Sequence, residues 1–394
     1  MCALLARRLH EPVTLAMLGW DSGSGAVFVP ADDGLGHAWN PAGAIASLRE
    51  ALEADGMDRR HFIAITGTTG TTLTTFAHDW LLEPARIAAA VQGKRIDQVV
   101  VDELRQLCLS SRKLDEAVGG GVAVFRTVRE HLRLAPEILD NATYTEQVGK
   151  GLYAVAAEFA QLAGWLAYDL NQHAIAQRFY IAGLRAAHSS GDQAIGANIL
   201  AFMGQQARYA DPRDAVRLAE SGLLGAKQLS PAVAARMHGR LAETAASAGD
   251  AVAANRAIEA MFNHHATIDP AVEPPWIYWW DTAETHYLAG QTALALDDPR
   301  RAEAHYRDAL VQLDPAYPRT RGRLLPQLAM ARLRMGELEG ACRAAAEAGT
   351  IGRKLGSERV RTRLIEFRRA AAPYANTQAL KHFDAKFADL FMRP

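Results

Sequence analysis

Two stretches of the chain, AIAQRFYIAGL (residues 174–184) and AEAHYRDAL (residues 302–310), decide the fold. Each has a small anchor residue, Ala176 or Ala302, followed by tyrosine four positions later, a small residue three positions after that, and then leucine. On an α-helix this spacing places the side chains on one face, where small residues let a neighbouring helix come close. A glycine lies twelve positions before each anchor, at Gly164 and Gly290. The pattern therefore predicts pairs of closely packed helices.

Weaker copies of this pattern continue at a regular interval. The anchor alanines are separated by 39, 39, 48 and 39 residues, at Ala176, Ala215, Ala254, Ala302 and Ala341. A small residue on one helix, followed by A-x3-[FY]-x2-A-L on the next, is typical of the tetratricopeptide repeat, whose ideal unit has about 34 residues. We therefore predict an all-α fold, in which a tetratricopeptide-like α-solenoid of about five helix pairs with a C-terminal cap at 357–390 follows a smaller helical N-terminal region.

Composition and pattern divide the rest of the chain. Residues 21–56 are predicted to be a linker and a short helix, because Gly, Ser, Asp and Pro give way to a helical pattern at 41–54. Residues 57–140 are predicted to be a helical N-terminal region. Its expected helices are 83–92, 96–117 and 122–139. The repeat domain with its cap is predicted to occupy 141–394.

Bulk composition is that of an ordinary globular protein. Hydrophobic residues make up 49% and charged residues 22%, a balance that argues against wholesale disorder. The net charge of −1 provides no overall basic field that would attract the chain to DNA or to an anionic membrane. No apolar run reaches the roughly 18–20 residues of a membrane span, and Cys2, Cys108 and Cys342 are too scattered for a disulfide framework. We expect a cytoplasmic protein without a membrane partner.

Four passages resemble bacterial transcriptional regulators that join an Xre-type helix-turn-helix domain to a tetratricopeptide-repeat domain. They are DGMDRRHFIAITG (55–67), LDEAVGGG (114–121), LAGWLAYDLNQHAIAQRFYIAGLRAAHSSGD (162–192) and PPWIYWWDTAE (274–284). MCALLARRLHEPVTLAMLGW (1–20) is similar to the closing helix and exit of such a DNA-binding domain. The resemblance implies that residues 1–20 are the remnant of the end of a helix-turn-helix domain and that most of this domain is missing. Either the true start lies upstream of Met1, or this is a paralogue that has lost the domain.

The resemblance implies a regulatory binding protein. Its repeat array would be the sensor or protein-interaction part of a transcriptional regulator, and would bind a peptide, a small ligand or a partner protein in its concave groove. A homodimer is left open, and DNA would be a partner only if an upstream helix-turn-helix exists. The alternative is an assembly scaffold or adaptor with no DNA or small-ligand role.

The motifs in the sequence do not predict catalysis, a cofactor or a metal. TGTTGTTLTT (66–75) lacks the Gly-Lys-[Ser/Thr] of a phosphate-binding loop, and nothing resembles the G-x-S-x-G of a serine nucleophile. Adjacent histidines point in different directions on a helix, and no H-x3-H pair accompanies them. That argument sets aside the one cluster of potential metal ligands, His264, His265, Asp269, Asp281, Glu284 and His286. We expect a non-enzyme with no cofactor and no metal.

Ligands of tetratricopeptide arrays lie against the first helix of each pair, so the repeat frame assigns the partner-binding residues by position. They are Glu158, Gln161, Trp165, Tyr168, Asp169, Arg208, Arg236, Glu243, Glu284, Tyr287, Gln291 and Arg334. This mixture of charged, amide and aromatic side chains suits a peptide with one or two apolar anchors. Exposed helix faces carry such residues as well, which is the alternative interpretation.

Two more stretches allow two interpretations each. The aromatic residues Trp276, Trp279 and Trp280, with Tyr278 among them, are either a hydrophobic plug where the repeat interval lengthens or an aromatic wall for a ligand. Residues 353–369 hold seven Arg or Lys against two Glu. They are either a solvated face of the cap or a contact for an acidic partner or a nucleic-acid backbone.

Overall fold

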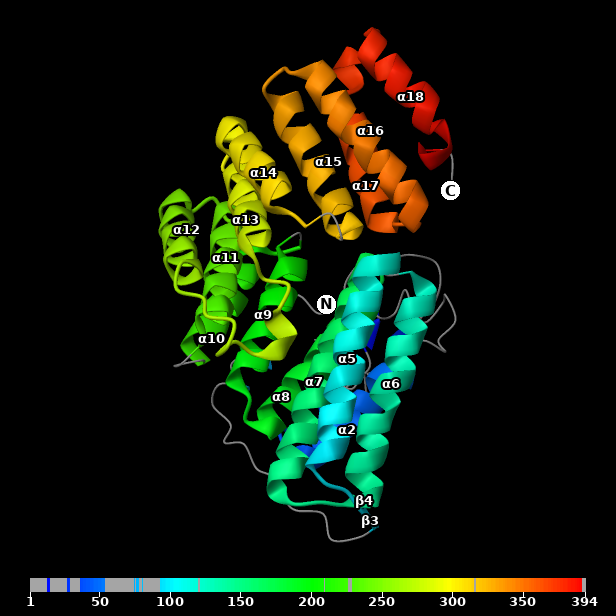
Figure 1. Cartoon of the computed structure of the whole chain (residues 1–394), viewed down its shortest axis with the longest axis vertical. Coiled ribbons are helices and arrows are strands. Elements are labelled where there is room, and N and C mark those ends of the chain that lie inside the picture. The colour runs from blue at the N-terminus through cyan, green and yellow to red at the C-terminus, as the bar shows by residue number, and fades with distance from the viewer. Residues whose placement is uncertain are drawn as a thin grey trace.

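The computed structural model describes residues 13–14, 27–28, 36–53, 74, 76–77, 80, 93–119, 121–208, 210–225, 229–314 and 317–391. The described part is almost entirely helical, so the predicted all-α class is confirmed (Figure 1). Its α-helices are α2 (Pro41–Glu53), α5 (Gln98–Val118), α6 (Val122–Asn141), α7 (Glu146–Asp169), α8 (His173–Ser190), α9 (Gln193–Ala207), α10 (Pro212–Gly225), α11 (Pro231–Ser247), α12 (Ala251–His265), α13 (Thr282–Ala295), α14 (Pro299–Gln312), α15 (Pro318–Arg334), α16 (Leu338–Leu355), α17 (Glu358–Ala370) and α18 (Gln378–Phe391).

Short elements connect these helices. Two 3-10 helices are η3 (Pro275–Ile277) and η4 (Ala372–Tyr374). Strand β1 (Val13–Thr14) pairs antiparallel with β2 (Val27–Phe28), and β3 (Lys94–Arg95) pairs in parallel with β4 (Ala142–Thr143), with Lys94 opposite Ala142. The pairing of β3 with β4 connects the residues just before α5 to those just after α6.

Consecutive helices from α7 to α16 pack in pairs, α7 with α8, α9 with α10, α11 with α12, α13 with α14, and α15 with α16. The second helix of every pair carries one of the five anchor alanines, and all five are fully buried. The predicted five helix pairs are therefore present, followed by α17 and α18 where the cap was expected. Figure 1 shows the pairs stacked in chain order.

Turns between helices use glycine and aspartate. Gly191 ends α8 with a left-handed φ of 76°, and the side chain of Asp192 accepts a hydrogen bond from the backbone N of Ile195 to begin α9. Asp250 and Asp298 cap α12 and α14 in the same way. Short turns of this kind keep neighbouring helices adjacent.

Two glycines set the distance between the helices of a pair. A Cβ atom at Gly164 or Gly290 would lie within 3.0 Å of the ring of Tyr180 or Tyr306 on the following helix. The predicted position of both glycines, at the contact between the two helices, is confirmed. The side chain nearest each glycine is the tyrosine ring, one turn beyond the anchor alanine, because the large ring fills the space that glycine leaves.

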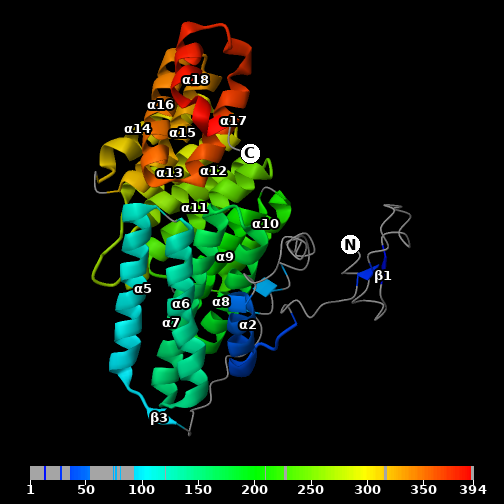
Figure 2. The same cartoon turned by 90° about the vertical axis from the view of Figure 1, so that its right-hand side faces the viewer.

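The N-terminal helices pack on the first pair. Helix α6 lies along α7, α2 lies against α8, and α5 contacts both α7 and α15 (Figure 2). One hydrophobic core continues from Leu48 through Val101 to Leu152 and into the array. Helices α2, α5 and α6 begin and end within two residues of the predicted helices 41–54, 96–117 and 122–139. The expected remnant at 1–20 and the expected helix at 83–92 lie outside the described residues, apart from Val13–Thr14.

No helix in the described ranges is long and apolar enough to cross a membrane.

Candidate ligand-binding cavity

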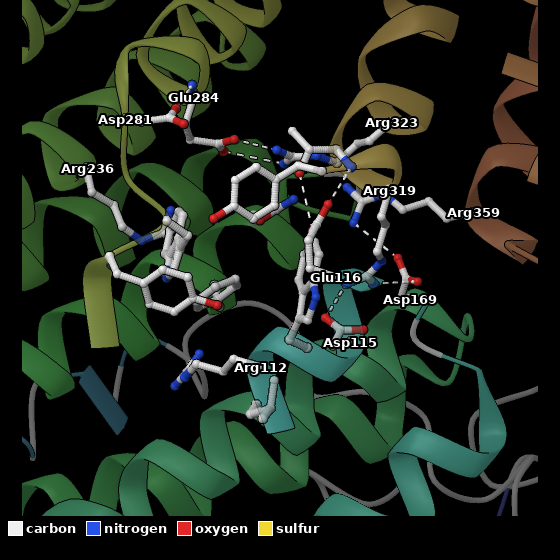
Figure 3. Close-up of a pocket in the computed structure, with 18 of the residues that line it drawn as sticks. Arg112, Asp115, Glu116, Asp169, Arg236, Asp281, Glu284, Arg319, Arg323 and Arg359 are labelled. Atoms are coloured by element: carbon white, nitrogen blue, oxygen red, sulfur yellow. Dashed lines mark hydrogen bonds and ion pairs between the residues drawn. The ribbon is translucent and has the colours of Figure 1, made fainter. Parts of the chain in front are cut away.

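A cavity lies among the first helices of the pairs. It encloses about 1150 Å³, including open solvent at its mouth. Residues from α5, α7, α9, α11, α13, α15 and α17 line it, together with the aromatic segment before α13. Its charged lining consists of Arg112, Asp115, Glu116, Asp169, Arg236, Arg240, Asp281, Glu284, Arg319, Arg323 and Arg359 (Figure 3).

One side of the cavity is closed by buried ion pairs. Arg319 on α15 contacts both Asp115 on α5 and Asp169 on α7, and Arg359 on α17 lies 3.6 Å from Asp169. Burial alone would raise the pKa of Asp169, but Arg319 and Arg359 together hold it below its ordinary value. Burial raises the pKa of Asp115 to about 6 in spite of Arg319, since Asp169 and Glu116 lie nearby. This network joins four helices that are distant in sequence.

Further pairs hold the neighbouring walls. Arg323 on α15 makes a bidentate contact with Glu284 on α13, and its guanidinium lies 4.2 Å from the centre of the Tyr287 ring. Glu116 on α5 accepts hydrogen bonds from the backbone N and the hydroxyl of Thr320. These contacts orient α15 against α5 and α13, so most of the carboxylates in the lining already have partners.

Two arginines in the lining differ from these. Arg112 on α5 donates from Nη2 to the backbone oxygen of Glu158, over 3.3 Å, and Arg236 on α11 donates from Nε to Oδ1 of Asn198, over 2.6 Å. Among the described residues, neither arginine has a carboxylate within ion-pair distance. In Figure 3 dashed lines reach Arg319, Arg323 and Arg359 but not Arg112 or Arg236.

Aromatic rings also line the cavity. Trp165 contacts Phe202, with ring centres 5.6 Å apart, and the guanidinium of Arg359 lies 4.9 Å from the centre of the Trp165 ring. Trp279 and Tyr278 reach the cavity from the segment before α13. A lining of rings, amides and arginines can bind the apolar body of a ligand and a negatively charged group.

The structure brings together five of the twelve residues assigned to the concave face, with one from the aromatic segment. Those that line the cavity are Gln161, Trp165, Asp169, Arg236, Glu284 and Trp279. All lie on a first helix of a pair or directly before one, as the repeat frame predicted. Their role in ligand binding stays a prediction.

Three assigned residues lie at neighbouring hollows. Glu158 and Trp276 line a separate depression beside α5, where burial raises the pKa of Glu158 to about 7. Tyr168 lines another depression between α7 and α17. These residues are one turn or less from the cavity lining on their own elements, and they face a different neighbour because a helix turns by about 100° per residue.

Four assigned residues belong to the packed interior between α9, α11 and α13. Glu243 is fully buried and contacts both Arg208 and Arg240, Arg208 donates to Gln291 over 3.3 Å, and Gln291 donates to the hydroxyl of Tyr287. The prediction that Arg208, Glu243 and Gln291 lie on the open face of a groove is therefore wrong, because the three side chains are packed between helices. Tyr287 is buried beside Arg323, at a small void separate from the cavity.

Arg334 and Trp280 also lie away from the cavity. Arg334, the last residue of α15, donates to the backbone oxygen of Leu294 and lies 3.5 Å from Asp297. Trp280 is buried, with Gly239 against its ring, as the plug interpretation of the aromatic segment requires. Trp279 instead faces the cavity, and the aromatic-wall interpretation stays a prediction for this residue.

Several lining residues were not predicted as site residues. Arg112, Asp115 and Glu116 come from α5, outside the repeat frame, and Arg319 and Arg323 come from the first turns of α15. A contact such as Asp115 with Arg319 spans 204 residues, and helical periodicity carries no information on it. Arg359 lies within the basic stretch 353–369, which was the one signal for its importance. Other arginines of that stretch pair on the cap, Arg353 with Asp389 and Arg368 with Asp384.

The histidines named as potential ligands are not gathered at one point. The ring of His264 stacks on that of His238, and His265 contacts the hydroxyls of Thr282 and Thr285. His286 instead meets His305, with the two Nδ1 atoms 3.2 Å apart, and Asp308 lies 3.7 Å from His286. In the described part of the chain this trio is the group that could hold a metal ion.

No protein-family model matches the chain, and no curated protein sequence matches it.

Proposed function

We propose that this chain is a regulatory binding protein, the sensor part of a transcriptional regulator, and that it binds a small ligand or a short peptide in the cavity. The observation that carries the proposal is the composition of the cavity wall. Side chains from α5 and from the first helix of all five pairs reach one hollow of about 1150 Å³, and aromatic rings alternate there with charged groups. A concave lining of aromatic rings with a few charged groups is typical of ligand sites.

The position of the cavity supports a sensing role. A ligand in it would touch α7 at the start of the array and α15 and α17 near its end. Binding shifts a conformational equilibrium only when the ligand has unequal affinity for two states. In a stack where each pair contacts mainly its neighbours, small rotations add along the array, and a ligand that bridges both ends would favour one curvature.

The link to transcription rests on the resemblance to Xre-type regulators with tetratricopeptide repeats. The 39-residue frame and the buried anchor alanines support the repeat part of that proposal. DNA sequence upstream of the Met1 codon tests the other part. An open frame that encodes a helix-turn-helix would support the regulator, and an in-frame stop directly upstream would favour the alternative, an assembly scaffold or adaptor.

Ligand capture tests the binding proposal. The purified chain is incubated with a low-molecular-mass extract of the source cells and washed, and the released molecules are identified by mass spectrometry. Wild type should release a defined species that Trp165→Ala does not, with circular dichroism showing equal helicity. Tyr374→Ala, at a partly exposed position far along the cap, is the matched control. If wild type releases nothing, or if Trp165→Ala captures as well as wild type, the cavity is not the site.

A further inference from the structure

Arg236 is a buried cation that forms no ion pair among the described residues. Its side chain is 1% exposed, yet among the described residues no carboxylate lies within ion-pair distance of it. Its Nε is satisfied by Asn198, and its Nη2 has no hydrogen-bond partner. Burial lowers the pKa of Arg236 to about 10. The charge of Glu284 acts against this shift, and the charges of Arg323 and Arg112 act with it. An arginine in such a place is costly unless something pairs with it.

Two aromatic rings fix the orientation of this guanidinium. Its central carbon lies 4.4 Å from the centre of the Phe202 ring and 4.7 Å from that of the Trp279 ring. Because both rings lie on the flat group and Asn198 occupies Nε, the Nη edge is what remains for a further partner. A planar donor edge held in this way matches the two oxygens of a carboxylate or a phosphate.

Arg112 adds a second positive charge to the same cavity. It lines the cavity from α5, is 9% exposed, and has no hydrogen-bond partner at Nε. The charge of Arg112 lowers the pKa of Arg236, and an anion bound by both guanidinium groups would offset that repulsion. The buried amide oxygen of Gln161 also lacks a partner and offers an acceptor to a ligand donor.

We propose that Arg236 and Arg112 bind the oxyanion, a carboxylate or a phosphate, of a small ligand whose apolar body lies against Trp279, Phe202 and Trp165. This inference rests on the proposed function, because it names the chemical class of the ligand for the same cavity. Arg319, Arg323 and Arg359 each have a carboxylate within ion-pair distance and shape the wall. Arg236 and Arg112 are the residues that select an anion.

A purely structural role for Arg236 makes the opposite prediction about stability. If the cation serves only packing, its removal should lower the melting temperature. If it is kept for a ligand, Arg236→Met should leave the melting temperature of the empty protein unchanged or raise it, since a buried unpaired charge is removed. Arg240→Met is the matched control, one turn further along α11. Arg240 is equally buried, but it is paired with Glu243 and Gln205, so its removal should lower the melting temperature.

Calorimetry with simple probes tests the ligand class. The probes are 3-phenylpropionate, phenyl phosphate, inorganic phosphate and the neutral 3-phenylpropionamide, at constant ionic strength. At least one of the two aromatic anions should bind at least about tenfold more tightly than the amide, which is the effect of one charged hydrogen bond. Arg236→Met and Arg112→Met should each remove that difference. The carboxylate and phosphate arms show which oxyanion the site prefers.

Several results would overturn the inference. They are equal binding of the amide and both anions, unchanged anion binding by Arg236→Met, a loss of melting temperature in Arg236→Met as large as that in Arg240→Met, and the absence of binding by every anionic probe. The ligand-capture experiment with the cell extract distinguishes failure of the anion proposal from failure of the proposed function. A captured ligand that is uncharged, or that Arg236→Met still captures, removes the anion class and leaves the cavity as the site.

Discussion

Arg319 on α15 donates a hydrogen bond from Nη2 to Oδ2 of Asp169 at the end of α7, over 2.8 Å and across 150 residues of sequence. The same guanidinium contacts Asp115 on α5, so three helices from both ends of the chain meet at one buried cation. Asp115 and Asp169 lie on different helices and are not neighbours in the sequence. The wall of the cavity therefore depends on a tertiary arrangement that this cation stabilises.

Replacement of Arg319 by methionine should destabilise the chain strongly. Asp115 and Asp169 would remain buried without their shared cation, and removal of one partner from a buried pair typically costs about 3–5 kcal/mol. The free energy of unfolding from urea titration measures the effect. Arg353→Met is the control, because the ion pair of Arg353 with Asp389 is exposed and should contribute less than about 1 kcal/mol. Equal effects of the two substitutions would contradict the assigned role.

Close packing of the helix pairs can be tested at the two glycines. Gly164→Leu and Gly290→Leu should each lower the free energy of unfolding by about 1–3 kcal/mol, because the new side chain overlaps the ring of Tyr180 or Tyr306. Gly121→Ala serves as a control, since nothing lies within 4 Å of a Cβ at that position. Thermal melts followed by circular dichroism provide the comparison. Wild-type stability of both leucine variants would argue against the pair contacts.

Helical periodicity predicted the elements well because each depends on local sequence. The anchor alanines and the glycine twelve residues before two of them lie on consecutive helices joined by a short turn, so the pattern that predicts their contact is local in sequence. The same reasoning assigned Arg208 and Arg236 to one groove, although only Arg236 faces the cavity. The repeat frame predicts which face of a helix a residue occupies. Whether that residue lines a cavity, like Arg236, or pairs with a buried carboxylate, as Arg208 does with Glu243, depends on the neighbouring helix.

Arg112 illustrates the other limit. It lies on α5, outside the repeats, and enters the site only because α5 packs against α7 and α15. No local pattern encodes that contact. The ligand class inferred from Arg112 and Arg236 consequently required the structure, whereas the position of the groove on the first helices did not.

Arg208 and Trp165 should separate stability from binding. Arg208→Glu would place a second carboxylate beside the fully buried Glu243, so we expect a loss of more than about 3 kcal/mol in the free energy of unfolding. Trp165 lines the cavity and is only partly buried, so Trp165→Ala should retain the fold and lose ligand capture. Circular dichroism and the capture experiment are applied to both variants. Retention of the fold by Arg208→Glu would show that Arg208 faces solvent.

Stability should also depend on pH through His305. The pKa of His305 is lowered to about 4. Burial is the largest cause, and His286 and Arg301 also lower the pKa, whereas Asp308 and Asp298 raise it by less. The unfolded chain binds a proton at this histidine below about pH 6.5, whereas the folded chain does not until about pH 4. The free energy of unfolding should therefore fall as the pH decreases from 6.5 to 4, and this group should contribute no change above 6.5.

His305→Gln provides the measurement, because it removes the titrating group. Urea titrations of wild type and variant at pH 7.5, 6.0 and 5.0 should show that wild type loses more stability than the variant between the highest and lowest pH. Chelator in all samples keeps any divalent ion from His286, His305 and Asp308, since a bound ion would exclude the proton and move the transition. Parallel pH profiles for the two proteins would mean that His305 binds its proton equally in both states, and that its contact with His286 does not hold it neutral.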